Sequence, residues 1–189
     1  YNGSVNNFWG HGILIGVSGN IDIWVAGTIL SPKDLGDIRI FMVILSLQLM
    51  ILEFHAQAWQ AKLVGFSIEN ELFDVARKSA KNILLFTTVL VSIALFVHWL
   101  LISISDSESL FLLMTIVAIG FFRGLNTLEG VILAVTGRQK IRFRISLVIN
   151  ILGVVCVAVA CRLLGASGFF IATLISAVVQ FCIYKYFRQ

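Results

Sequence analysis

The stretch "IRIFMVILSLQLMILEFHAQAW", residues 38–59, decides the fold class of this chain. Arg39 and Glu53 are its only Lys, Arg, Asp or Glu residues. Its length matches the roughly 20 residues that a membrane-spanning helix needs. Other stretches have the same character, so we expect six spanning helices. They run approximately over Phe8–Leu30, Ile38–Trp59, Asn82–Ile104, Leu110–Val135, Ile145–Leu163 and Phe169–Tyr186.

The composition of the whole chain agrees with this prediction. Of its 189 residues, 59% are hydrophobic and 13% charged, and the mean hydropathy is +0.97. A soluble domain usually carries about 25% charged residues. A membrane barrel would show alternating segments of about ten residues, and the runs here are roughly twice that length. We therefore predict an all-α integral membrane protein.

The Lys and Arg residues, which give a net charge of +4, predict the orientation. Most fall between the spans, where such residues set topology and meet anionic headgroups, so we expect no nucleic-acid partner. One side would carry Lys62, Arg77, Lys78, Lys81, Arg138, Lys140, Arg142, Arg144, Lys185 and Arg188. The other would carry Lys33, Arg39 and Arg162. This imbalance predicts a multi-pass protein of the inner (plasma) membrane with both termini cytoplasmic.

The long connection after the second span predicts a surface element of its own. In "SIENELFDVARKSAKN" an amphipathic helix over about 68–81 would lie along the cytoplasmic surface, with Asp74 paired to Lys78. Its apolar face would carry Leu72, Val75, Ala76 and Ala80. An ordinary connecting helix between two spans remains an equal alternative.

Polar residues inside the spans are the candidates for a substrate or ion pathway, because charged groups at mid-membrane cost about 3 kcal/mol or more each. The charged candidates are Asp22, Glu53, Arg123 and Glu129. The uncharged candidates are Asn20, Gln48, His55, His98 and Asn126.

Asp22 and Arg123 lead this set. Asp22 follows the glycine-rich stretch "GHGILIGVSGN", where Gly19 and Asn20 would break the helix beside a cavity. Arg123 lies midway along its span, on a helical face shared with Asn126, Thr127 and Gly130. Its guanidinium would neutralise Asp22 or bind a phosphate. The alternative is an ion pair that only holds two helices together.

The remaining candidates are ranked lower. Glu53 and His55 lie near the cytoplasmic end of the second span, where they would form a proton relay or be ordinary interfacial residues. Glu129 points about 120° away from the Arg123 face. The cysteines show no metal-ligand spacing, and we expect neither a metal nor a cofactor.

An enzyme is not expected. The sequences "GVSG" at 16–19 and "GASG" at 165–168 resemble the G-x-S-G pattern of rhomboid-type intramembrane proteases. In that resemblance the serine pairs with a histidine on a later span, yet no histidine follows Ser167. Ser18 has later histidines but lies in the first predicted span, not a middle one.

Three stretches together resemble a transporter family. "NIDIWVAGTILSPKDLGDIRIFMVI" is similar to an acidic span followed by an outer loop of the type xxPxDxG. "AVTGRQKIRFRISLVINILG" resembles a basic GRxK inner loop and the next span. "LLGASGFFIATLIS" is similar to the final GAxGaaiATlis hairpin. The family is that of the polysaccharide flippases, within the multidrug/oligosaccharidyl-lipid/polysaccharide exporter superfamily.

The resemblance implies that this chain is the second, C-terminal half of a twelve-helix alternating-access transporter, and the missing N-terminal half would be a partner. The substrate would be a polyprenyl-diphosphate-linked oligosaccharide, with a coupling proton or sodium ion. Asp22 would release Arg123 on binding that ion. A cation-coupled multidrug exporter of the same superfamily and a non-transporting membrane scaffold remain as alternatives.

Overall fold

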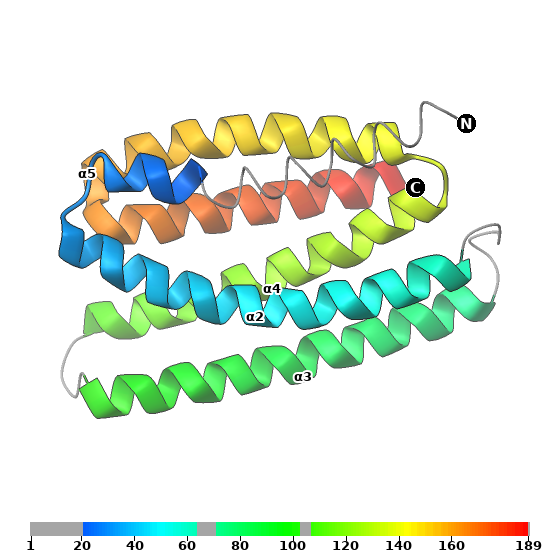
Figure 1. Cartoon of the computed structure of the whole chain (residues 1–189), viewed down its shortest axis with the longest axis horizontal. Coiled ribbons are helices and arrows are strands. Elements are labelled where there is room, and N and C mark those ends of the chain that lie inside the picture. Colours follow the sequence, from blue (N-terminus) through cyan, green and yellow to red (C-terminus); the bar gives the residue numbers. More distant parts are fainter. Residues whose placement is uncertain (1–20, 64–70, 103–106, 189) are drawn as a thin grey trace.

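The computed structural model describes residues 21–63, 71–102 and 107–188, and this part of the chain is all-helical (Figure 1). Its long helices are α2 (Pro32–Leu63), α3 (Glu71–Ile102), α4 (Ser107–Val135) and α5 (Gln139–Arg188). All four are long and apolar enough to cross a membrane. Large apolar side chains also cover their outer surfaces, among them Phe54, Phe86, Phe111 and Leu163. The predicted all-α membrane-embedded fold is therefore confirmed.

The first predicted span lies mostly outside the described residues. Its end is helical over 21–27, and a turn over 28–30 leads into α2. The α2 helix begins at Pro32, six residues before the predicted start. The Ser31 hydroxyl accepts a hydrogen bond from the Asp34 amide at 3.3 Å and donates one to the Asp34 carboxylate at 2.7 Å. The segment before residue 38, which hydropathy predicts to be a loop, therefore contains the first turn of α2. This turn is capped by Ser31 and has proline at its first helical position.

Of the segment predicted as a separate surface helix over 68–81, residues 71–81 form the first turns of α3, which runs without a break into the third predicted span, and residues 68–70 lie outside the described part. The buried residues of this segment are Phe73, Ala76 and Ala80. Val75, predicted on the apolar face, is 54% exposed. Asp74 pairs with Arg77 at 3.7 Å, one residue before the predicted Lys78. The amphipathic pattern therefore packs one end of α3 against the bundle.

The fifth and sixth predicted spans both belong to α5, which bends at Gly165 (φ +63°, ψ −142°) and folds back on itself (Figure 1). We call residues 139–164 the first arm and residues 166–188 the second arm. A Cβ atom on Gly168 would collide with the backbone carbonyl of Ala160, so the arms meet backbone to backbone. The "GASG" sequence thus has a structural explanation in the turn and contact of the two arms.

Helix α4 lies at the centre of the bundle and packs against α2, α3 and α5. Two glycines four residues apart allow this close approach, as in other membrane helix pairs. A Cβ atom on Gly120 would lie 2.9 Å from Leu45, and one on Gly124 would lie 2.9 Å from Leu52. Gly12 and Gly16 have the same spacing in the sequence, and they lie outside the described residues.

The segments predicted to be cytoplasmic share one end of the bundle. The end of α2, the start of α3, the α4–α5 turn and the end of α5 lie together there, and the bend of α5 lies at the opposite end (Figure 1). In the α4–α5 turn, Gly137 (φ +78°) permits a hydrogen bond of 2.9 Å from the Arg138 amide to the Leu133 carbonyl. The Arg138 guanidinium also donates to the Phe187 carbonyl, which joins this turn to the last turn of α5.

Candidate functional site

Arg123 occupies the middle of the central helix. Its span covers Phe111–Val135, so the Arg123 backbone lies about 18 Å from either end at 1.5 Å per residue. The Arg123 side chain is half-buried. The backbone carbonyl of Arg123 accepts a hydrogen bond of 3.2 Å from the Thr127 hydroxyl. A guanidinium at this depth is too far from both membrane surfaces to reach water along its own side chain, so it requires a polar partner within the bundle.

Asp22 supplies that partner. The helical segment 21–27 holds the half-buried Asp22 side chain, and its carboxylate attracts the Arg123 guanidinium. The structure therefore brings together the two charges that the sequence placed far apart in the chain. Asn20, predicted beside them, lies outside the described residues. The roles of all three in transport stay predictions.

Asn126, one turn along α4, fixes the second arm of α5. It is 7% exposed, and its side-chain amide donates a hydrogen bond of 2.9 Å to the backbone carbonyl of Ala177. Its own side-chain carbonyl is buried without a hydrogen-bond partner. One end of Asn126 therefore has a structural role, and the other is an unused acceptor close to Arg123 along the same face of α4.

Glu53 and His55 face different neighbours, which argues against a direct relay between them. Glu53 is exposed on α2, and its carboxylate attracts Arg142 of α5. His55 is half-buried, packs edge-on against Trp59 with ring centroids 6.3 Å apart, and has no hydrogen-bond partner at Nε2. Gln48, another uncharged candidate on α2, is 2% exposed and donates a hydrogen bond of 3.0 Å to the Thr88 hydroxyl.

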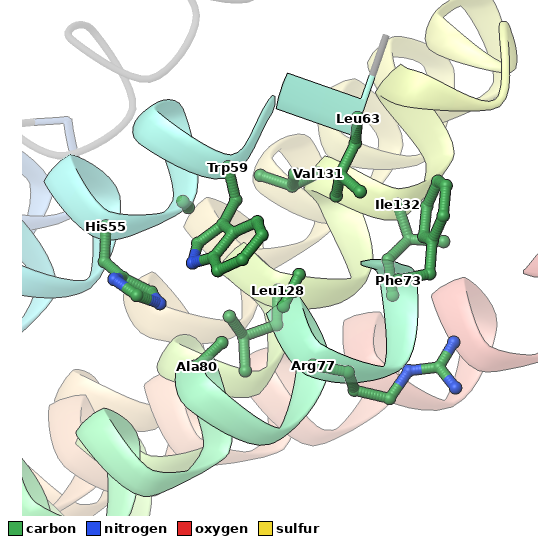
Figure 2. Close-up of a pocket in the computed structure, with 11 residues that line it drawn as sticks. His55, Trp59, Leu63, Phe73, Arg77, Ala80, Leu128, Val131 and Ile132 are labelled. Carbon is green, nitrogen blue, oxygen red and sulfur yellow. The ribbon is translucent and has the colours of Figure 1, made fainter. Parts of the chain in front are cut away.

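His55 borders a small pocket of about 40 Å³ between α2, α3 and α4. Figure 2 shows the His55 and Trp59 rings directed into the space between the helices, while the Arg77 guanidinium extends away from it. The apolar lining includes Trp59, Leu63, Phe73, Leu128, Val131 and Ile132. A space this small and apolar has few groups to hold water or a polar ligand. We therefore do not place the functional site there.

Two other candidates contribute less. Glu129 is half-buried on α4, away from the face that carries Arg123. His98 belongs to α3, and its side chain lies outside the described part of the structure.

A polar cluster that the sequence pattern did not predict lies between the two arms of α5. The Tyr184 hydroxyl lies 2.6 Å from the Ser146 hydroxyl and accepts a hydrogen bond of 3.0 Å from the Gln180 amide. Arg142, which was counted only as a cytoplasmic topology residue, lies within interaction range of the same hydroxyl. The available signal was helical spacing: Arg142 and Ser146, like Gln180 and Tyr184, are four residues apart and share a face.

Comparison with known proteins finds no family model, no curated protein and no solved structure that matches this chain.

Proposed function

We propose that this chain is a six-span half-bundle of an alternating-access transporter that flips a polyprenyl-diphosphate-linked oligosaccharide across the inner membrane. The observation that carries the proposal is Arg123, held in the middle of the central helix and attracted by Asp22. A planar guanidinium suits a diphosphate because it donates paired hydrogen bonds to two oxygens. The resemblance of the three sequence stretches to polysaccharide flippases supports the same substrate class.

In this proposal Asp22 neutralises Arg123 when no substrate is present. Binding of a proton or sodium ion at Asp22 frees the guanidinium for the diphosphate, and release of that ion restores the pair. The basic end of the bundle, with the α4–α5 turn, faces the cytoplasm because Lys and Arg concentrate on that side. A second six-span half completes the pathway.

The test uses cells that lack the intact gene. We expect lipid-linked oligosaccharide to accumulate in the cytoplasmic leaflet and surface polysaccharide to disappear, and the wild-type gene to restore both pools. Arg123→Ala and Arg123→Lys should both fail to restore them, because the lysine cannot reproduce paired donation. Arg144→Ala, which removes an exposed arginine, is the matched control and should restore transport.

Full transport by Arg123→Ala, at wild-type expression, would refute the role given to Arg123. Unchanged pools in the deletion strain would instead favour the second candidate, a cation-coupled drug exporter. The half-buried Asp22 carboxylate is the feature that favours this candidate, and drug efflux driven by a proton or sodium gradient would measure it. Loss of neither activity would leave a structural scaffold.

A further inference from the structure

Arg142 is enclosed at the end of the bundle where α4 turns into α5. By surface exposure its side chain is half-buried, and its Nε atom is fully enclosed. A Cβ atom built on Gly130 of α4 would lie 3.0, 3.3 and 3.4 Å from Nε, Cζ and Nη2 of Arg142. Three atoms of the group at similar distances mean that the flat guanidinium covers the Gly130 backbone. A glycine at position 130 therefore makes room for this arginine.

One donor of the guanidinium, Nε, lacks the partner that its burial demands. An arginine has five N–H donors, and the Nε donor of Arg142 has no hydrogen-bond acceptor in the structure. The guanidinium hydrogen-bonds with the nearby Tyr184 hydroxyl, which Ser146 and Gln180 also contact, and this bond leaves Nε without an acceptor. An unsatisfied buried donor is costly, and more so when it is charged. The missing acceptor is therefore the feature that points to a ligand.

The charges around Arg142 favour an anion as that ligand. Glu53 of α2 attracts Arg142 electrostatically, but it is exposed and can turn to water when an anion arrives. Lys140 and Arg144, on the same turns of the first arm, are exposed and add positive potential. These two exposed positive charges would concentrate anions next to the half-buried Arg142 guanidinium.

We propose that Arg142 is the binding residue of a second anion site, between Gly130 of α4 and Tyr184 of the second arm, which takes a phosphate or diphosphate group. This inference rests on the proposed function, in which the site would receive the diphosphate of the lipid carrier before Arg123 does. Position 130 is seven residues from Arg123 along α4, about 10 Å at 1.5 Å per residue. One diphosphate therefore contacts the two arginines in succession.

The test measures binding to the full chain in detergent by titration calorimetry. Inorganic pyrophosphate and farnesyl diphosphate are the probes, and vesicles of phosphatidylglycerol provide a lipid phosphate without a diphosphate. We expect Arg142→Gln to weaken diphosphate binding by about tenfold or more, since it removes a charge-assisted pair. Arg144→Gln removes the same charge from an exposed position and should change affinity by less than about twofold.

Gly130→Ala provides a variant with no change of charge. Its methyl group would press on the Arg142 guanidinium, so diphosphate affinity should fall although every positive charge remains. This variant also keeps the test decisive if Arg142→Gln fails to fold. Equal binding by pyrophosphate and farnesyl diphosphate would support a site for a free anion, and binding of farnesyl diphosphate or phosphatidylglycerol alone would support a lipid headgroup.

Three results would overturn the inference: no binding of any probe to the wild type, unchanged binding in Arg142→Gln, or an equal loss in Arg144→Gln. These results are separable from the fate of the proposed function. Transport that depends on Arg123 but not on Arg142 would remove the second site and leave the flippase. Binding that depends on Arg142 in a chain that does not support flipping would leave the site and remove the flippase.

Discussion

The close backbone contact between the two arms of α5 predicts a strong effect for Gly168→Ala. The new methyl group would collide with the carbonyl of Ala160 and lie 3.1 Å from the amide nitrogen of Cys161. Backbone atoms cannot rotate away as a side chain can, so the two arms of α5 must separate. Phe169 and Phe170, which are 0% and 1% exposed, would lose contacts as a result.

The cost follows from the loss of dispersion energy, which drives packing between helices in lipid. A gap of about 0.5–1 Å removes a quarter to a half of the energy of each contact. If each phenylalanine makes ~50 contacts of about 0.1 kcal/mol, losing a quarter from both costs about 2.5 kcal/mol. This lies within the usual range of about 1–3 kcal/mol for overpacking a core.

Thermal unfolding of the purified chain in detergent would measure this cost. We expect the midpoint to fall by about 5–10 °C for a chain of this length. Gly36→Ala is the matched control, because Gly36 lies in α2 and a Cβ atom there would meet nothing within 4 Å. Alanine is the better helix former by about 1 kcal/mol, so the control should be neutral or stabilised. A Gly168→Ala variant as stable as this control would refute the close contact between the arms.

Three further substitutions test other contacts by the same unfolding measurement. Gly165→Ala should cost about 1–3 kcal/mol through backbone strain alone, since its positive φ disfavours a side chain although the space is open; a neutral result would contradict the bend. Asn126→Ala should cost about 0.6–1.7 kcal/mol by removing the hydrogen bond to the Ala177 carbonyl. Gly120→Ala should cost about 1–3 kcal/mol by displacing Gln48, and Gln48→Ala in the same chain should recover part of it, because the loss is steric.

The extents of the helices show what hydropathy can and cannot predict. The end of α4 at Val135 matches the prediction, because the apolar run stops there and a glycine-containing turn follows. The start of α2 does not match, since its first turn is built from polar residues that cap the helix without entering the apolar run. The start of α3 differs for a similar reason: its charged first turns continue the helix beyond the predicted span.

The attraction between Asp22 and Arg123 could be predicted, because a charge deep in a spanning helix needs an opposite charge and few were available. The attraction between Glu53 and Arg142 could not be predicted, because the sequence pattern shows both residues only as ordinary polar groups near span ends. Their attraction depends on how α2 and α5 pack, and no pattern within either helix reports that packing.

By itself, the sequence determined that this chain is a helical membrane protein and which of its charges are costly. Lipid cannot satisfy open backbone groups, so long apolar runs must become helices whatever their neighbours are. Only the tertiary structure decided which basic residue is enclosed. Arg142 and Arg144 have the same chemistry and nearly the same place in the chain, but they point about 160° apart around the helix. Packing against Gly130 encloses the first, and the second remains exposed.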